Sequence, residues 1–478
     1  MKKLMLVLVS MLAFAGIANA ELQLKNPCAD GMVLQQNADA VIWGFAAPGS
    51  TITVCPSWDG HRYRVKTDSD GEWRAYVATP AGGFTKYTVR VSGDGTTKTI
   101  NDVLVGEVWF ASGQSNMEMP LRGWNLCPVK DQQEHISAPA DPDGVRMFII
   151  PMEVSMVPEK NADGRWWYST PAERAEMSAT AYFFAKKLRE TLDVPVGIIN
   201  GSYGGTMLEC WAPANVAGKW GLAVDEASLA AIHVGDRQTT HYNKQIAPCV
   251  GYTIKGMIWY QGCSNVGRCD QYAQRFADIV AELRKNWNVG EFPVYAVEIA
   301  PFDYGNNLSP ILREQQWKSV ELTPNCAMIP TNDLVSKYER HNIHPGDKLS
   351  VGNRLAYLAL NRDYGYGYIK CLAPKVVRAW KNGQGGIVLK IDNAACGLMT
   401  CEDIEGLEIS DDGKCFHPVS SFSFDNNEGL LTIGGNDDVE EPCYVRYCWG
   451  DWIIGNIISC DGFPLPAFNI CVNDVKTI

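Results

Sequence analysis

Residues 106–120 read GEVWFASGQSNMEMP, an apolar run that ends in a turn around Gly113 and presents Ser115 directly after it. An apolar run of this length next to a glycine predicts a buried strand. A turn after such a strand can expose a nucleophilic hydroxyl beside backbone N–H donors. Taken alone, however, a serine in a turn is more often structural than catalytic. The stretch therefore predicts a strand followed by a turn. Ser115 is a candidate nucleophile, and the rest of the sequence has to decide between a catalytic and a structural role.

Downstream of this stretch, buried strands, glycine-rich loops and helices alternate. Residues 179–191 have helical spacing, and residues 194–200 form an apolar run that leads into the glycine-rich segment 201–205. A second apolar run covers residues 254–260, and apolar side chains recur at helical spacing after Asp270. This alternation predicts an α/β domain with a parallel sheet covered by helices. In such sheets the ligand crevice lies at the carboxyl ends of the strands, so we expect a site in the loops after them.

Both flanks of this region have the period-two pattern of antiparallel β structure. The chain has 478 residues, which is more than one hydrophobic core usually organises. We therefore predict three parts in the mature chain. They are an N-terminal β-sandwich domain at residues 21–105, a catalytic α/β domain at 106–365 and a C-terminal β domain at 366–478.

Residues 1–20 have the pattern of a signal peptide. Two lysines stand near the start, an apolar run covers residues 4–17, and residues 18–20 (Ala-Asn-Ala) form the small-x-small pattern of a cleavage site. We expect the mature chain to start at Glu21. No later stretch approaches the roughly 20 apolar residues that a membrane helix needs. The pattern predicts an exported protein without a membrane span, located in the periplasm or outside the cell.

The composition argues against some partners and allows some cross-links. The formal net charge of −12 argues against a nucleic-acid partner, because binding to phosphates depends on clustered Lys and Arg. A neutral or weakly charged substrate fits better. Sixteen cysteines in an exported chain allow disulfides, and six of them lie between Cys396 and Cys460, so we expect any cross-links to lie in the C-terminal region. No cysteine pair stands with histidines at zinc-ligand spacing, so the sequence predicts no zinc site.

Several separated blocks of the sequence agree with one known family. The blocks are GQSNM at 113–117, NGSYGGT at 200–206, Tyr242-Asn243 with 246–248, WYQGCSN at 259–265, and Ile343-His344-Pro345 followed by Lys348. In these blocks and their order the chain resembles the sialate O-acetylesterases and related carbohydrate acetylesterases of the SGNH-hydrolase group. The resemblance implies a three-layer α/β domain with a parallel sheet, flanked by N- and C-terminal β domains. It also implies hydrolysis of acetyl esters on a sialic acid, a xylan, a mannan or another glycan.

The resemblance further implies the roles of individual residues. It makes Ser115 the nucleophile and His344 the general base that removes its proton. Ester hydrolysis passes through a tetrahedral oxyanion, so hydrogen-bond donors must converge on one oxygen. By the resemblance, these donors are the backbone N–H groups of Ser115 and Gly205 and the side-chain amide of Asn265. This mechanism needs neither a metal ion nor an organic cofactor.

The chain departs from the family pattern at two places. Many SGNH enzymes have an aspartate just before the base, where this chain has His341 and Asn342, and related enzymes often have glutamate at the position of Cys263. The group that orients the imidazole is therefore open between Asp333 and a Ser-His dyad in which a backbone carbonyl holds the ring. His341 is the local competitor for the base, and Cys263 is an alternative nucleophile.

We interpret the chain as a secreted carbohydrate O-acetylesterase with a Ser-His mechanism. The alternative is a catalytically weakened esterase scaffold that acts as a carbohydrate-binding protein, which the departures at Asn342 and Cys263 motivate. The presence of both Ser115 and His344 together with the two further oxyanion donors favours the enzyme. The sequence does not indicate the oligomeric state.

Overall fold

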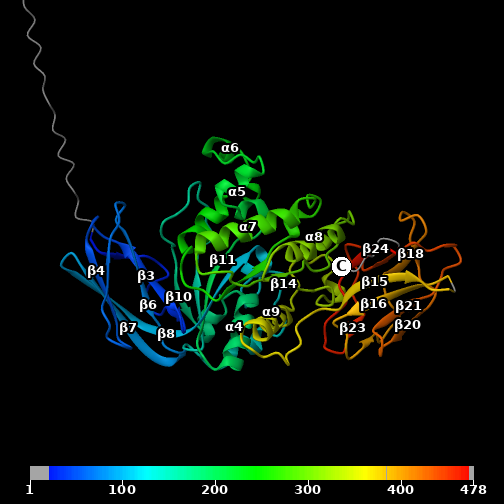
Figure 1. The fold of residues 1–478 in the computed structure, drawn as a ribbon, viewed down its shortest axis with the longest axis horizontal. Coiled ribbons are helices and arrows are strands. Elements are labelled where there is room, and N and C mark those ends of the chain that lie inside the picture. The colour runs from blue at the N-terminus through cyan, green and yellow to red at the C-terminus, as the bar shows by residue number, and fades with distance from the viewer. Residues whose placement is uncertain (1–20, 384, 473–478) are drawn as a thin grey trace, which may run out of the picture.

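The computed structural model of the chain describes residues 21–383 and 385–472 (Figure 1). The predicted signal peptide at residues 1–20 lies outside the described residues. The N-terminal β region, the α/β region and the C-terminal β region follow one another along the molecule, so the two β regions lie at opposite ends (Figure 1). Within the described ranges, no helix is both long and apolar enough to cross a membrane.

The long strand β8, Thr96–Gly113, connects the N-terminal region with the α/β region. Its first residues alternate in exposure, whereas every residue from Val103 onward is buried. Alternation is typical of a sheet with one solvent-exposed face. Continuous burial is typical of a parallel sheet that is covered on both faces. Accordingly, the first part pairs antiparallel with β7, Gly83–Gly93, and the second pairs parallel with β11, Val196–Ser202. The domain boundary predicted after residue 105 therefore falls inside a strand.

The central sheet has the strand order β10-β9-β11-β8-β12-β13-β14. All neighbouring strands run parallel except the edge strand β10, which pairs antiparallel with β9. The predicted parallel sheet is confirmed, and its central strands are apolar because helices cover both faces. The remaining strands are β9, Val145–Ile149, β10, Arg165–Tyr168, β12, Gly256–Tyr260, β13, Val294–Val297, and β14, Cys326–Ile329.

Two pairs of long helices make the outer layers (Figure 1). One pair shares a buried cluster that contains Phe183 and Leu355, and the other shares a second cluster that contains Phe276 and Leu312. The first pair is in close contact at Gly352, where a Cβ atom would lie 2.6 Å from the Cβ of Phe183. These pairs are α4, Ala179–Leu192, with α9, Lys348–Asp363, and α7, Tyr272–Trp287, with α8, Ser309–Leu322. Shorter helices are α1, Ser115–Glu118, α2, Gln132–Ser137, α3, Pro171–Arg174, α5, Ala214–Lys219, and α6, Glu226–Ala230.

The N-terminal region has two sheets with antiparallel pairing, as its period-two pattern predicts, except that β2 pairs parallel with β8. One sheet has the order β1-β3-β6, and in the other β4 pairs with β5 and β7 before β7 pairs with β8. The side chains of Val41 and Ile52 belong to the same buried cluster as Phe110 of the central sheet. The strands are β1, Gln23–Leu24, β2, Val33–Gln35, β3, Asp39–Phe45, β4, Thr51–Pro56, β5, Tyr63–Lys66, and β6, Glu72–Ala78.

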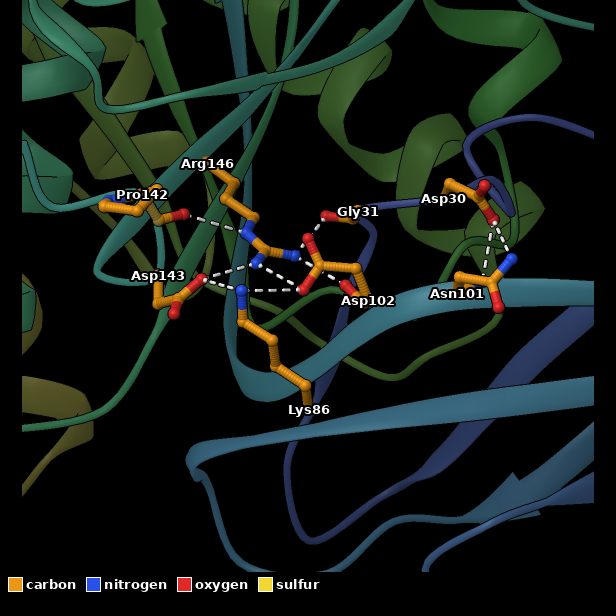
Figure 2. Close-up of polar contacts among 8 residues, drawn as sticks. All are labelled: Asp30, Gly31, Lys86, Asn101, Asp102, Pro142, Asp143 and Arg146. Atoms are coloured by element: carbon orange, nitrogen blue, oxygen red, sulfur yellow. Dashed lines mark hydrogen bonds and ion pairs between the residues drawn. The ribbon is translucent and has the colours of Figure 1, made fainter.

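A buried arginine ties the N-terminal region to the central sheet (Figure 2). Arg146 of β9 is fully buried and donates to the backbone carbonyls of Gly31 and Asp102. Its guanidinium also pairs with the carboxylates of Asp102 at 3.0 Å and Asp143 at 2.8 Å, which Lys86 of β7 contacts from the surface. A buried guanidinium is tolerated only when its donors are satisfied, so this cluster fixes how the two regions pack.

The C-terminal region has a hydrophobic core of its own, which contains Leu389, Leu431 and Val445. Its larger sheets have the orders β15-β16-β21-β20 and β19-β18-β22-β24, and β17 pairs with β23. The predicted C-terminal β structure is therefore present. The strands are β15, Lys375–Lys381, β16, Ile387–Asp392, β17, Leu398–Met399, β18, Leu407–Ser410, β19, His417–Pro418, β20, Phe422–Asp425, β21, Leu430–Ile433, β22, Tyr444–Tyr447, β23, Ile458–Ser459, and β24, Phe468–Cys471.

The expected cross-links of the C-terminal region are not formed. All sixteen cysteines are among the described residues, and all of them are free thiols. The six C-terminal cysteines are distributed over separate strands and loops, and Cys448 is buried while Cys396 and Cys460 are exposed. The number of cysteines allows pairs but does not make them, because a disulfide needs two side chains in one narrow geometry, which sequence spacing does not specify.

Candidate active site

Three predicted site segments meet at the carboxyl edge of the central sheet. The strands β11, β8 and β12 are neighbours, and Ser202 and Tyr260, their last residues on either side, both lie opposite Gly113 of β8. The loops that follow carry Ser115, Gly205 and Asn265, so the register of the sheet brings them to one place. At Gly113 φ is +131° and a Cβ atom would lie 2.2 Å from the carbonyl oxygen of Tyr260, so only glycine fits there.

Ser115 is the first residue of the short helix α1 and is largely buried. Its Oγ lies 2.8 Å from Nε2 of His344. The turn before it is held by Gln114, whose backbone N–H donates to the Tyr260 carbonyl and whose Oε1 accepts the N–H of Gly262, both at 2.8 Å. The structure thus brings the predicted nucleophile and the predicted base into hydrogen-bond distance.

The segment between β14 and α9 carries His344. Asn342 holds its backbone on both sides, because Oδ1 accepts the His344 N–H at 3.0 Å and Nδ2 donates to the His344 carbonyl at 2.9 Å. Asn116, the neighbour of Ser115, donates to the carbonyl of Ile343 at 3.0 Å. The side chains of Asn342 and Asn116 thereby hold the backbone at His344 next to Ser115.

The imidazole of His344 is neutral over most of the pH range. Burial lowers its pKa to about 4, and the ammonium of Lys348 acts in the same direction. A histidine that loses its proton this early has a free lone pair at neutral pH, as a general base requires. Lys348 itself is fully buried, and its Nζ donates to Oδ1 of Asn116 at 2.5 Å.

Neither Asp333 nor His341 contacts the ring of His344. Asp333 binds Arg354 with both carboxylate oxygens, at 2.8 and 2.6 Å, so it is directed to that guanidinium and not to His344. The side chain of His341 is 78% exposed and lies 3.9 Å from Asp303. Within the described part of the chain, no carboxylate contacts the ring of His344. Its Nδ1 instead faces Sγ of Cys127 at 3.8 Å.

Two backbone N–H groups at the site are unpaired. Within the residues that the structure describes, those of Ser115 and Gly205 donate to no protein acceptor. The N–H of Gly204 is already used, because it donates to Oε2 of Glu118 at 2.6 Å. Of the two adjacent glycines, Gly205 is therefore the one with a donor to offer. Burial raises the pKa of Glu118 to about 7, while the bond from Gly204 opposes that shift.

The side-chain amide of Asn265 has a fixed orientation. Its Oδ1 accepts the Leu208 N–H at 2.9 Å and the Gln261 Nε2 group at 2.8 Å, so Nδ2 is the donor end. One Nδ2 hydrogen goes to Oε2 of Glu209 at 3.1 Å, which leaves the second hydrogen available. Asn265 is the last residue of the 3-10 helix η5, Cys263–Asn265, directly after β12.

Cys263 lacks the surroundings of a nucleophilic thiolate. It is buried, and burial raises the pKa of its thiol above the ordinary value. Reactive cysteines have lowered pKa values and contact a base, and no histidine contacts Cys263 among the described residues. The geometry therefore favours Ser115 over Cys263 as the group that a base can activate.

Three residues at this site could not be identified from the sequence. Glu118, Trp124 and Cys127 all follow the nucleophile closely, but they belong to no recognisable motif. The ring of Trp124 packs edge-on against His344 with 5.0 Å between ring centroids. Among the described residues, no group of three or more His, Cys, Asp or Glu side chains is arranged to hold a metal ion.

The chain is similar to proteins of known activity. Residues 105–361 match the family described as carbohydrate esterase, sialic acid-specific acetylesterase. The sialate O-acetylesterase of Mus musculus is 26% identical over 487 residues, which cover 88% of each chain, and that of Pongo abelii is 29% identical over 472 residues, which cover 88% of this chain and 86% of the relative. The crystal structure of a carbohydrate acetylesterase from Xanthomonas citri has a TM-score of 0.82 and 32% identity, covering 94% of this chain and 99% of that chain.

Proposed function

The chain belongs to the carbohydrate esterase family of sialic acid-specific acetylesterases, and from this premise we propose that it is an exported serine esterase that removes acetyl groups from sugars. Membership of this family makes the chain a hydrolase of acetylated carbohydrates. The proposal adds the roles of individual residues. Ser115 is the nucleophile, His344 is the base, and the N–H groups of Ser115 and Gly205 with the Asn265 amide bind the oxyanion.

The proposed reaction has two acyl-transfer steps. Nε2 of His344 takes the proton of the Ser115 hydroxyl while Oγ forms a bond to the acetyl carbonyl carbon. The imidazolium then gives this proton to the sugar oxygen, the ester bond breaks, and the sugar leaves with a restored hydroxyl group. Water, deprotonated by His344, attacks the acetyl-Ser115 ester in the same way. Acetate leaves, and Ser115 recovers its proton.

The 2.8 Å contact between Ser115 Oγ and His344 Nε2 carries this proposal. It supports catalysis because it lies at the carboxyl edge of the sheet, beside two N–H groups without a protein acceptor. Preorganised donors of this kind are each worth roughly 3 kcal/mol of transition-state stabilisation. A binding protein would have no need for a neutral imidazole aimed at a serine hydroxyl.

The proposed substrate is an acetylated carbohydrate. The relatives named above are sialate O-acetylesterases, so an O-acetylated sialic acid is one candidate substrate, and acetylated xylan or mannan is the other.

The leader pattern at residues 1–20 supports export to the periplasm or the exterior. Amino-terminal sequencing of the exported protein tests this point, since export with cleavage predicts a first residue of Glu21.

Acetate release from a panel of acetylated sialosides and acetylated hemicellulose oligosaccharides tests the function. We expect turnover on at least one of these classes and none in Ser115→Ala. If the wild-type chain binds the acetylated sugars but releases no more acetate than Ser115→Ala, the chain is a carbohydrate-binding protein on an esterase scaffold.

A further inference from the structure

A small loop next to the nucleophile surrounds the ring of His344. Trp124 and Cys127 exchange backbone hydrogen bonds, Trp124 N to Cys127 O at 3.0 Å and the reverse at 3.1 Å, which closes a tight turn. Leu126 adopts the left-handed conformation with φ of 64° at the tip of this turn. The backbone N–H of Lys130 donates to the carbonyl of Gly346 at 2.9 Å, which fixes the loop to the segment that carries the base.

With His344 as the base, as proposed, the hydrogen bonds around its ring have one consistent direction. To accept the Ser115 proton, Nε2 must carry a lone pair, so the ring hydrogen is on Nδ1. That hydrogen faces Sγ of Cys127 at 3.8 Å. Sγ lies 3.2 Å from Oδ1 of Asn342. Because Asn342 Oδ1 accepts one backbone group of His344 and Nδ2 donates to the other, this amide cannot be flipped, and Oδ1 is an acceptor.

It follows that the thiol of Cys127 donates to Asn342 and turns a sulfur lone pair toward His344. We propose that Cys127 is the positioning residue of His344 and occupies the place of the carboxylate in a serine triad. It selects the productive tautomer of the ring but supplies no negative charge. This inference rests on the proposed function, in which His344 is the base, and it assigns the third position that neither Asp333 nor a backbone carbonyl fills.

The surroundings keep this thiol protonated. Burial raises the pKa of Cys127, and the carboxylate of Glu339 acts in the same direction, while the ammonium of Lys348 opposes them. Among the described groups, those that set the charge state around the ring are therefore Lys348, Glu339 and the thiol itself. A sulfur atom is a weak acceptor, and catalytic hydrogen bonds are often long in the absence of substrate, which fits the 3.8 Å contact.

The test compares Cys127→Ala with Cys127→Ser. The hydroxyl of the serine variant can donate to Asn342 and accept from Nδ1, whereas alanine can do neither. We expect Cys127→Ala to lower kcat roughly five- to tenfold with little change in KM, as for the loss of one neutral hydrogen bond. Cys127→Ser should retain at least half of wild-type kcat. Cys55→Ala, at another partly buried cysteine in the N-terminal region, is the control and should equal wild type.

The second readout does not depend on activity. In protein labelled with ¹⁵N-histidine, the shifts of the two ring nitrogens report the tautomer, and His344→Gln identifies the signal. We expect the Nδ1–H tautomer in wild type and Cys127→Ser and a mixture of tautomers in Cys127→Ala. Unchanged kcat and tautomer in a Cys127→Ala protein with a wild-type melting temperature would overturn the inference. Absence of esterase activity in wild type would instead overturn the proposed function, while the tautomer measurement would still decide the role of Cys127.

Discussion

The two halves of the site are built in different ways. The half that carries Ser115, Gly205 and Asn265 consists of loops that start directly at the ends of three adjacent strands. The half that carries His344 consists of two loops that hold each other through side-chain and backbone contacts, with Cys127 and Asn342 separated by 215 residues in the chain. We will call these the strand half and the loop half.

The difference decides how strongly catalysis should depend on each side chain. In the strand half the sheet register fixes where the loops begin, and hydrogen bonds from Leu208 and Gln261 orient the Asn265 amide. In the loop half each position depends on several weak contacts, so single substitutions should have graded effects. We therefore expect large catalytic losses from the strand half and smaller ones from the periphery of the loop half.

The largest effect is expected at the nucleophile. Ser115→Ala should lower kcat for acetate release by at least about a thousandfold, because the covalent step is lost. The melting temperature should stay within a degree or two of wild type, since among the described residues the hydroxyl contacts only His344. Ser319→Ala, a buried serine of α8, is the matched control and should keep full activity. More than a tenth of wild-type activity in Ser115→Ala would remove Ser115 from this role.

A second large effect is expected at the oxyanion donor. Asn265→Ala should lower kcat by roughly a hundredfold and leave KM almost unchanged, because the donor acts in the transition state. The melting temperature should fall as well, since Leu208 N and Gln261 Nε2 lose their acceptor. A change in KM alone, measured by steady-state kinetics, would make Asn265 a substrate-binding residue.

A moderate effect is expected in the pH profile. Because burial and Lys348 lower the pKa of His344 to about 4, the acid limb of kcat/KM should lie near that pH and not near 6.5. Removing the nearby positive charge raises the pKa of the imidazole, so in Lys348→Met the limb should move to higher pH by about one unit, or tenfold in proton affinity. An acid limb that stays in place would show that Lys348 does not act on His344.

The smallest catalytic effect is expected at Asp333, at the edge of the loop half. Asp333→Asn should leave kcat within about twofold of wild type, because the carboxylate binds Arg354 and not the base. Stability should fall by about 1–3 kcal/mol, since a buried guanidinium loses its counter-charge. Chemical denaturation measures this loss of stability. A loss of two orders of magnitude in kcat would instead make Asp333 the third member of a triad.

The strand half could be predicted from the sequence, and the loop half only in part. Hydrophobic runs that end in glycine turns locate the strand ends, and the family blocks that follow these ends single out Ser115, Gly205 and Asn265. His344 was found from its family block alone. Cys127 has no local signal, because its contact to His344 arises only when two loops far apart in sequence pack together.

The partners of Asp333 and of the C-terminal cysteines also depend on packing. Asp333 lies in the loop after β14, and which partner its carboxylate takes depends on α9, where Arg354 lies. The cysteine count suggested C-terminal disulfides, yet pairing needs side-chain geometry that no count contains. Patterns of polarity thus predict elements and their edges, whereas specific side-chain partners follow from packing.

Covalent labelling tests directly whether His344 activates Ser115 as the nucleophile. Diethyl 4-nitrophenyl phosphate transfers a diethyl phosphoryl group to an activated serine and releases 4-nitrophenolate. We expect one adduct per chain by intact mass, located on Ser115 by peptide mapping, and no adduct within the same time in His344→Gln. An adduct on Cys263 or any other residue, or equally fast labelling of Ser115 in His344→Gln, would contradict it.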